Sequence, residues 1–292
     1  MPPPCPAPPA EQRRSSRLLV PAGAVDCHAH VIGSPPEYPF VPQRSFTPPP
    51  AAPKSYLAML DATSMTYGVL IQVSVHGTDN RLLVQTLSRN RSRLRGIAVM
   101  PLGLPESAYA AAKGAGVRGL RLNDLYGGGI DFSQLREYGA LAREMGWHLQ
   151  FLLDVRRLPE LAPAIAALPV PYVVDHMGHF PVAEVPLSDA RFQTLVGLVR
   201  DGGWVKLSGA YRLSAGGALY EDTVPYAQCL FDVAPTRCVW GSDWPHVAHW
   251  KTMMGVDDLL DTLALWVPAP EAQRAVLVDN PATLYGFDRT AR

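Results

Sequence analysis

The sequence predicts a single-domain α/β protein, a (β/α)8 TIM barrel. Short apolar segments rich in β-branched residues occur eight times along the 292 residues, as is typical of strands buried on both faces. Stretches with helical spacing alternate with them, and the length suits a fold of roughly 250 residues. A doubly wound open sheet is the main alternative, but a dinucleotide-binding sheet has a Gly-rich turn after its first strand, where this chain carries histidines.

The predicted elements follow one another from residue 24 onward. The expected strands are Val25–Ile32, Val69–Val75, Leu94–Met100, Val117–Leu122, Trp147–Leu153, Tyr172–Val174, Trp204–Leu207 and Arg237–Trp240. The expected helices are Ser55–Ser64, Asp79–Asn90, Glu106–Ala115, Ser133–Met145, Leu158–Ala167, Ser188–Arg200, Glu221–Val233, Val256–Val267 and Pro270–Val278. Asp79 and Ser133 are predicted N-caps, because a short side-chain oxygen accepts the free N–H groups of a first helical turn.

The first 22 residues differ in composition from the rest. Six of the first ten are proline, and apolar periodicity is absent, so we expect residues 1–22 to form a disordered or surface-lying arm and residues 23–292 to form the barrel. A second Pro-rich stretch, Pro35–Pro53, contains Tyr38, Phe40 and Phe46. These aromatic residues predict either a segment held over a pocket or a surface loop with packed aromatic side chains.

Composition narrows the classes of partner and location. The formal net charge is zero, whereas nucleic-acid binding favours a basic excess, so we expect no nucleic-acid partner. No apolar run approaches the ~18 residues of a membrane helix, and no signal-peptide core is evident. The four cysteines have no C-x-x-C spacing, which predicts free thiols and a cytoplasmic location. The oligomeric state has no signature in the sequence.

Candidate catalytic residues stand at the predicted carboxyl ends of strands, where barrel enzymes carry their active sites. Asp26, His28 and His30 alternate along the first strand, so strict alternation places all three side chains on one side. Two imidazoles at this spacing can share a metal ion or one substrate oxygen. Asp243 follows the eighth strand, which neighbours the first when the barrel closes, and His176 follows the sixth.

Further polar residues occupy the same predicted end of the barrel. Ser74 and His76 follow the second strand, Arg121 ends the fourth, and Lys206 and Arg212 belong to the seventh strand or the loop after it. Arginine pairs bidentately with carboxylates, so Arg121 and Arg212 favour a small anionic substrate, although either is also compatible with a structural ion pair. Imidazoles or a metal can polarise a carbonyl, and a carboxylate can act as general base toward water.

These motifs resemble the amidohydrolase superfamily, and within it the lactonase branch that contains 2-pyrone-4,6-dicarboxylate lactonase. The matching segments are 25–33 (VDCHAHVIG), 71–80 (IQVSVHGTDN), 118–123 (RGLRLN), 174–178 (VDHMG), 241–246 (GSDWPH) and the ending 279–285. The resemblance extends from about Pro21 to near the end of the chain. It implies a barrel hydrolase that opens a lactone ring of a carboxylated pyrone, muconolactone or sugar acid in aromatic or sugar-acid catabolism.

The resemblance also implies roles for individual residues. Asp243 would activate water, and His28, His30 and His176 would polarise the lactone carbonyl. The implied substrate-binding residues are Ser74, His76, Arg121, Arg212, His246, Phe46 and His179. No metal would be required, or a single divalent ion such as zinc would be held by His28, His30 and Asp243, since no lysine ends the fourth strand to bridge two metals.

Departures from the lactonase pattern concern the substrate. Gly127 and His179 stand where the dicarboxylate lactonase has arginines, and Phe46 and Leu152 stand where it has tyrosines. Two lost charge-assisted hydrogen bonds, each worth about 1.5–3 kcal/mol, would weaken binding of the same dicarboxylate by ~10²–10⁴-fold. We therefore expect a substrate with fewer or differently placed carboxylates. Arg156 and Arg157 are additional cations, which either face the pocket or lie on the surface.

Two other functions remain compatible with the sequence. A metal-dependent decarboxylase of the same superfamily would use His28, His30 and Asp243 to hold zinc, and it would release carbon dioxide instead of opening a ring. A barrel retained only as a binding protein is disfavoured, because it would not need His28, His30, His176 and Asp243 together.

Overall fold

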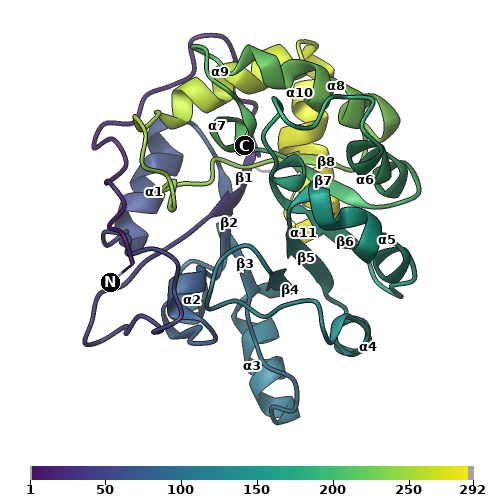
Figure 1. Cartoon of the computed structure of the whole chain (residues 1–292). Helices are drawn as coiled ribbons and strands as arrows, with labels where there is room; N and C mark the ends of the chain where they lie inside the picture. Colours follow the sequence, from purple (N-terminus) through teal and green to yellow (C-terminus); the bar gives the residue numbers. More distant parts are fainter. Residues whose placement is uncertain (1, 289–292) are drawn as a thin grey trace.

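The computed structural model describes residues 2–288 and forms the barrel that the sequence predicts. Eight strands make one sheet in chain order, and every adjacent pair is parallel. The strands are β1 (Val25–Ala29), β2 (Tyr67–Ile71), β3 (Leu94–Ala98), β4 (Val117–Asn123), β5 (His148–Leu152), β6 (Tyr172–Val174), β7 (Trp204–Leu207) and β8 (Cys238–Trp240). They gather at the centre of the molecule with the helices around them (Figure 1).

The barrel closes where β1 meets the segment that follows β8. The amide of Asp243 donates to the carbonyl oxygen of His28 at 2.7 Å, and the amide of His30 donates to Trp244 at 2.8 Å. Ala29 and Trp244 form an isolated parallel bridge at this point. Closure therefore brings the first and last candidate motifs together through main-chain hydrogen bonds.

The helices follow the predicted order, with differences at their ends. They are α1 (Pro53–Ala62), α2 (Arg81–Arg89), α3 (Glu106–Ala115), α4 (Leu135–Met145), α5 (Leu158–Ala166), α6 (Ala190–Arg200), α7 (Ala210–Leu213), α8 (Val224–Val233), α9 (Val256–Trp266), α10 (Pro270–Arg274) and α11 (Asn280–Tyr285). Short single-turn segments are η1 (Ser74–His76), η2 (Val155–Arg157), η3 (Asp175–Gly178), η4 (Glu221–Thr223) and the wider turn η5 (Ala275–Asp279).

Several boundaries differ from the expectation. The second strand spans Tyr67–Ile71 instead of Val69–Val75, because the chain turns into η1 at Ser74. The predicted N-cap at Ser133 is wrong: α4 begins at Leu135, and Ser133 bonds Asp131 instead. Helix α2 has Asn80 in the N-cap position, one residue after Asp79, although Asp79 still accepts the Arg81 amide at 3.2 Å. The short helix α7, which carries Arg212, was not predicted.

The barrel interior has an apolar end and a polar end. At the amino ends of the strands, side chains from β1, β2, β3, β6, β7 and β8 pack with Tyr285 and Phe287 from the end of the chain. Toward the carboxyl ends the buried interior contains Arg121, Gln150, Asp175 and Lys206, all less than about 6% exposed. Charged groups this deeply buried must be paired, so the polar layer is a set of mutual contacts beneath the active-site end.

Strand β1 contains an irregularity that changes the expected direction of one side chain. Its register with β2 shifts between Asp26 and Ala29. Cys27 packs in the barrel interior, while the Asp26 carboxylate turns to the Tyr56 hydroxyl of α1 and to Ser242. The prediction that Asp26 shares a side with His28 and His30 is therefore wrong, because a bulge breaks the alternation on which it depended.

The N-terminal residues lie against the barrel. Ser16 donates to Asp261 of α9, and the indole of Trp250 donates to the carbonyl oxygen of Pro4 at 2.8 Å. The amide of Cys5 donates to Thr47, so this segment also contacts the Pro-rich stretch 35–53. Within the described residues, no helix is long and apolar enough to cross a membrane.

Candidate active site

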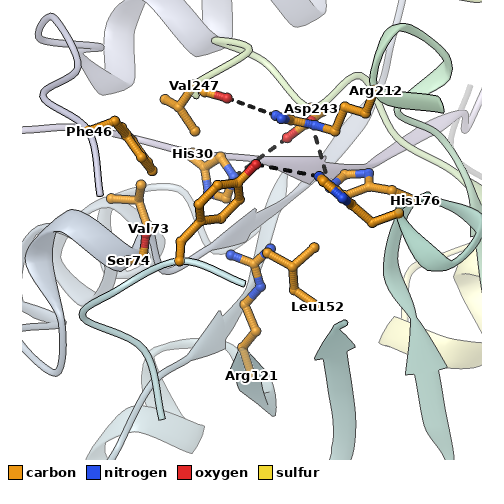
Figure 2. Close-up of a pocket in the computed structure, with 12 residues that line it drawn as sticks. His30, Phe46, Val73, Ser74, Arg121, Leu152, His176, Arg212, Asp243 and Val247 are labelled. Atoms are coloured by element: carbon orange, nitrogen blue, oxygen red, sulfur yellow. Dashed lines mark hydrogen bonds and ion pairs between the residues drawn. The ribbon is translucent and has the colours of Figure 1, made fainter. Parts of the chain in front are cut away.

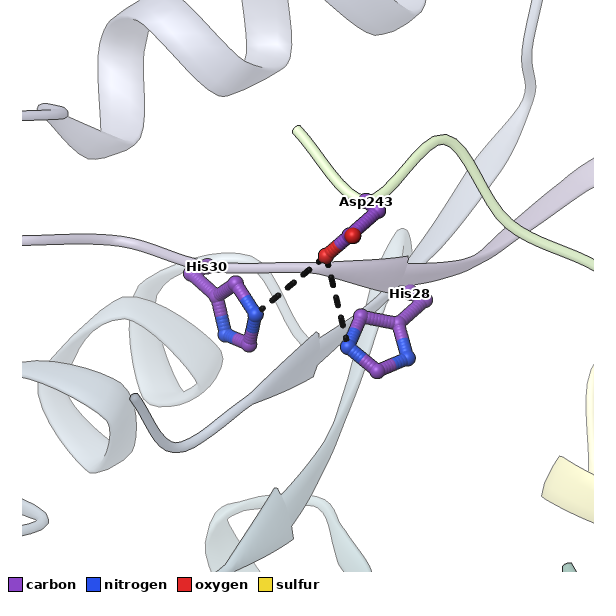
Figure 3. A group of neighbouring side chains, drawn as sticks. All are labelled: His28, His30 and Asp243. Carbon is purple, nitrogen blue, oxygen red and sulfur yellow. Dashed lines mark ion pairs between the residues drawn. The ribbon is translucent and has the colours of Figure 1, made fainter. Parts of the chain in front are cut away.

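Three histidines surround one carboxylate at the carboxyl end of the barrel. His28 Nε2 and His30 Nε2 lie 3.7 and 3.6 Å from Asp243 Oδ1, and His176 Nε2 lies 3.6 Å from Asp243 Oδ2. Figure 3 shows the imidazoles of His28 and His30 directed at the same oxygen of Asp243. These distances are too long for direct hydrogen bonds. His30, His176 and Asp243 line a common cavity, and His28 is fully buried behind it.

Asp243 makes its strong contacts through its other oxygen. Oδ2 accepts from the Tyr211 hydroxyl at 2.6 Å and from Arg212 Nε at 2.7 Å. Burial alone would raise the pKa of Asp243, but its close contacts, above all with the Arg212 guanidinium, outweigh burial and hold the pKa well below its usual range. Asp243 is therefore ionised, with Oδ1 facing His28 and His30.

The imidazoles around Asp243 are held neutral. Burial is the largest cause, and it lowers the pKa of His176 to about 3 and that of His28 and His30 below the usual value. His30 Nδ1 lies 2.8 Å from the carbonyl oxygen of Ile71, which can only accept, so Nδ1 carries the proton and Nε2 is bare. His176 Nδ1 lies 2.9 Å from the Ser208 hydroxyl. The contacts of Nδ1 with Ile71 and Ser208 thus fix the orientation of the His30 and His176 rings.

A small cavity opens beside these groups. Its volume is about 20 Å³, enough for one water molecule. The lining side chains are His30, Phe46, Val73, Ser74, Arg121, Tyr126, Leu152, His176, His179, Arg212, Asp243 and Val247. Phe46, Val73 and Ser74 lie on one side of it, with Arg212, Asp243 and His176 on the other (Figure 2). A lactone ring is larger than this space, so its entry requires some lining side chains to move.

Two residues expected in the substrate pocket do not line this cavity. His76 Nε2 accepts from the Gly33 amide at 3.2 Å, and Nδ1 contacts the Pro39 carbonyl oxygen, so His76 holds the Pro-rich stretch 35–53 to the barrel. His246 is fully buried against the ring of Tyr211. Neither ring nitrogen of His246 has a hydrogen-bond partner within residues 2–288.

The structure also brings in residues that the motifs did not single out. Tyr211 bonds Asp243 directly, and Tyr126 lines the cavity with its hydroxyl 3.4 Å from His179 Nε2. Asp175 lies under the histidines, where Arg121 Nη2 reaches its Oδ2 at 3.3 Å. Tyr211 precedes Arg212 in the sequence, and Asp175 precedes His176. Adjacency to a predicted site residue was therefore the signal by which Tyr211 and Asp175 could have been found.

The departures from the lactonase pattern have a structural counterpart. A Cβ atom on Gly127 would lie 1.9 Å from the carbonyl oxygen of Gln43, so in this conformation the loop around Gly127 and the stretch 35–53 leave no space for a side chain there. His179, Phe46 and Leu152 all line the cavity. Arg156 pairs with Asp154 and Glu184, and Arg157 pairs with Asp124, so both additional arginines lie in ion pairs outside it.

His28, His30 and Asp243 could hold one metal ion. Each offers one ligand atom, and these atoms lie within 4.8 Å of one another. Zn–N and Zn–O bonds are about 2.0–2.2 Å long, so ligand atoms around a tetrahedral zinc are separated by roughly 3.4 Å, close to the 3.6 and 3.7 Å found here. His28 Nε2 and Asp243 Oδ1 are buried without hydrogen-bond partners in the described part of the chain. These atoms fit a single ion.

Comparison with known proteins identifies the class. The amidohydrolase family model matches residues 25–287, and the chain belongs to that family. The chain is 34% identical to a 4-sulfomuconolactone hydrolase of Rhizobium radiobacter, over 97% of this chain and 96% of that one. It is 35% identical to a 2-pyrone-4,6-dicarboxylate hydrolase of Comamonas testosteroni, over 92% of each chain.

Solved structures agree with the fold. A probable 2-pyrone-4,6-dicarboxylic acid hydrolase from Acinetobacter baumannii, with citric acid bound, is 26% identical and has a TM-score of 0.80 over 91% of this chain and 100% of that one. A more distant amidohydrolase from Burkholderia multivorans has zinc bound; it is 18% identical, with a TM-score of 0.71 over 91% of this chain and 100% of that one.

The curated relatives agree with the prediction of a lactone-opening hydrolase. The two described above are hydrolases named for a muconolactone and a pyrone. They do not favour the alternative of a decarboxylase. The prediction of an enzyme that acts on a cyclic ester is therefore confirmed at the level of reaction class.

Proposed function

We propose that this protein hydrolyses the lactone ring of a small anionic substrate, with Asp243 as general base. The observation that carries the proposal is the convergence of His28, His30 and His176 on Asp243 at 3.6–3.7 Å. A buried carboxylate that lies beside neutral imidazoles and lines a water-sized cavity can activate water next to groups that polarise a carbonyl.

Each group has one task in the proposed reaction. Asp243 takes a proton from water as the water oxygen attacks the lactone carbonyl carbon. The imidazoles that present an N–H group stabilise the negative charge that develops on the carbonyl oxygen, since preorganised polar groups in a site without bulk water are effective there. The ring C–O bond then breaks, and the departing oxygen takes up the proton. The product is a carboxylic acid that ionises, so each turnover releases one proton into solution.

The substrate is proposed to carry a carboxylate that binds Arg212 and Arg121. Both arginines line the cavity, and Arg212 is paired with Asp243 in this structure. An anionic group on the substrate would compete with Asp243 for Arg212. The apolar lining by Phe46 and Leu152, and the lack of space at Gly127, favour a pyrone, muconolactone or sugar-acid lactone with fewer carboxylates than a pyrone dicarboxylate.

The proposed reaction requires no metal, or uses a single divalent ion held by His28, His30 and Asp243. When bound, such an ion would act as a Lewis acid on the lactone carbonyl. Arg121, Arg212 and the cavity lining would orient the substrate in either case. We also propose a cytoplasmic location, because all four cysteines are free thiols.

A panel of lactones tests the proposal. Pyrone, muconolactone and sugar-acid lactones with zero, one or two carboxylates are mixed with the purified protein, and proton release is followed with a pH indicator. We expect turnover with a monocarboxylate and loss of turnover in Asp243→Asn, which should still unfold cooperatively, at lower stability because Arg212 loses its buried counter-charge. A fully active Asp243→Asn variant would refute the proposed base, and carbon dioxide release would indicate a decarboxylase instead.

A further inference from the structure

A fully buried lysine lies directly beneath the candidate active site. Lys206 of β7 is 0% exposed, and its Nζ lies 3.1 Å from His28 Nδ1, on the opposite edge of the ring from the nitrogen that faces Asp243. The reaction proposed above assigns Lys206 no role. A buried ammonium must be surrounded by acceptors, so the position of each of its protons can be deduced.

The ammonium of Lys206 has three protons and no capacity to accept. Three acceptors lie within 3.1 Å of Nζ: the carbonyl oxygen of Cys27 at 2.8 Å, Gln150 Oε1 at 2.9 Å and His28 Nδ1 at 3.1 Å. A fourth, Asp175 Oδ1, lies further away at 3.3 Å. Cys27 and Gln150 can only accept through these oxygens. The third proton of Lys206 is then directed at His28 Nδ1, which must accept it with its lone pair.

Asp175 is the competing partner for the same ring nitrogen. Its Oδ1 lies 3.4 Å from His28 Nδ1 and 3.3 Å from Lys206 Nζ, and it makes no hydrogen bond within residues 2–288. Asp175 Oδ2 accepts from Arg121 and from Gln150 instead. A proton on His28 Nδ1 would also point toward the Lys206 ammonium, which electrostatic repulsion disfavours. The distances and the charges therefore favour the lysine as donor.

We infer that Lys206 is a positioning residue that holds His28 in the Nε2–H tautomer, so that His28 donates a hydrogen bond into the active site. His30 has the opposite arrangement, because the Ile71 carbonyl oxygen holds its proton on Nδ1. His28 and His30 are thus one donor and one acceptor. This inference rests on the proposed function, since the donor would serve the lactone carbonyl oxygen.

The tautomer has a consequence for metal binding. A ring nitrogen that carries a proton has no lone pair for a metal ion, so ligation by His28 would require that proton to leave Nε2. Loss of Lys206 would permit this change, because His28 Nδ1 could then carry the proton and donate it to Asp175 Oδ1. Lys206 therefore works against a metal ion at the cluster of His28, His30 and Asp243, even though the spacing of the three atoms suits one.

Nuclear magnetic resonance of the full chain tests the inference directly. Long-range proton–nitrogen correlations of the imidazole rings, assigned with His28→Gln, distinguish a protonated from a bare nitrogen. We expect Nε2 of His28 to be protonated and Nδ1 bare, with the reverse for His30. A proton on Nδ1 of His28 would overturn the inference. No substrate is needed, so absence of lactonase activity would refute the proposed function and leave this measurement intact.

A matched pair of variants tests the role of Lys206. Lys206→Met removes the donor to His28, whereas Gln150→Leu disturbs the same buried network at a residue that does not touch His28. We expect Lys206→Met to move the His28 proton to Nδ1 and to bind zinc about 10- to 100-fold more tightly by calorimetry, and Gln150→Leu to change neither. Equal effects of both variants, or an unchanged tautomer in folded Lys206→Met, would overturn the inference. If Lys206→Met does not fold, the spectrum of the unchanged protein decides.

Discussion

Arg212 and Asp243 form the closest ion pair at the cavity, and each is more than nine-tenths buried. Arg212 places Nε and Nη2 at 2.7 Å from Asp243 Oδ2, and Nη2 also donates to the carbonyl oxygen of Val247. Buried pairs of this kind hold their partners rigidly, and removal of one member leaves the other uncompensated. A substrate carboxylate that replaced Asp243 as the partner of Arg212 would keep the guanidinium satisfied.

Replacement of Arg212 tests that exchange. We expect Arg212→Met to raise KM for a carboxylated lactone about 10- to 100-fold, because one charge-assisted hydrogen bond contributes roughly 1.5–3 kcal/mol. KM for an uncharged lactone of the same ring should change much less. Steady-state kinetics on the two substrates makes the comparison, and an equal rise for both would show that Arg212 does not bind the carboxylate.

Chelation tests whether the histidines act directly. If His28 donates a hydrogen bond to the carbonyl oxygen, exhaustive dialysis against a chelator should leave kcat/KM within about two-fold of its starting value. Metal content is measured on the same samples. Activity that disappears with the metal and returns on addition of zinc would contradict this expectation.

At the scale of elements, the site depends on how β1 meets the end of β8. The shifted register in β1 turns Asp26 out of the barrel, where it accepts from the Ser242 amide at 2.8 Å and from the His28 amide at 3.2 Å. One buried carboxylate thereby ties the strand of the histidines to the loop of Asp243. The loop after β8 contains residues in the left-handed region, Asp243 at φ 59° and His246 at φ 61°. The hydrogen bonds of Asp26 hold this loop in place.

The stretch 35–53 and the loop around Gly127 meet beside the cavity. The stretch 35–53 contributes Phe46, whose ring meets Tyr126 edge to face, and the Ser45 hydroxyl accepts from the Gly127 amide at 2.9 Å. Glycine at 127 permits the close approach of the stretch 35–53, since a Cβ there would lie 1.9 Å from the carbonyl oxygen of Gln43. Glycine at 128 likewise permits close contact with η1, since a Cβ there would lie 2.3 Å from the carbonyl oxygen of Ser74. The substrate pocket is therefore shaped by contact between two loops.

Substitution of Gly127 tests the contact. We expect Gly127→Ala to lower the free energy of unfolding by about 1–3 kcal/mol, because its new methyl group meets the Gln43 backbone, and to raise KM as Phe46 shifts. Gly114→Ala is the control: it lies in α3 with no atom within 4 Å of the new Cβ, and it should stabilise the protein by about 0.5–1 kcal/mol. Urea unfolding measures both, and a stabilising Gly127→Ala would contradict the proposed packing.

At the scale of the whole molecule, the eight histidines make stability depend on pH. Burial lowers the pKa of every one of them, to about 3 for His148, His176 and His246. The unfolded chain binds these protons below about pH 6.5, and the folded chain does not, so stability is full above that pH and falls as the pH decreases. Burial raises the pKa of Asp26 to about 6, and it also raises the pKa of Asp124 and Asp257; these carboxyl groups oppose the trend.

We therefore expect the urea midpoint to fall steadily between pH 7.5 and pH 5. His148 lies on β5 outside the cavity and should contribute about 2 kcal/mol of that loss at pH 5, from a pKa of about 3 when folded and about 6.5 when unfolded. His148→Gln should reduce the slope of stability against pH by this amount while kcat/KM changes little. An unchanged slope would show that His148 is not held neutral.

The fold could be predicted because alternation of strand and helix patterns is a local property of the sequence. The order and type of the predicted elements agree with the structure, although the short helices α7 and α11 were not predicted. The end of β2 differs from the prediction because the chain turns into η1 there. The candidate site was partly accessible, since His28, His30, His176 and Asp243 all follow or end strands. Tyr211 and Tyr126 were missed, because nothing in the spacing of a lone tyrosine indicates which carboxylate or cavity it will reach.

The sequence by itself determined the barrel, the family and the set of groups available at its carboxyl end. Only the tertiary structure decided which way those groups face. Asp26 does not face the same side as His28 and His30, because the bulge in β1 depends on pairing with β2. His76 contacts the stretch 35–53 instead of the cavity, because that loop folds back on η1. The proton position on His28 depends on Lys206, 178 residues away. Such features depend on contacts between distant segments, which periodicity along the chain does not encode.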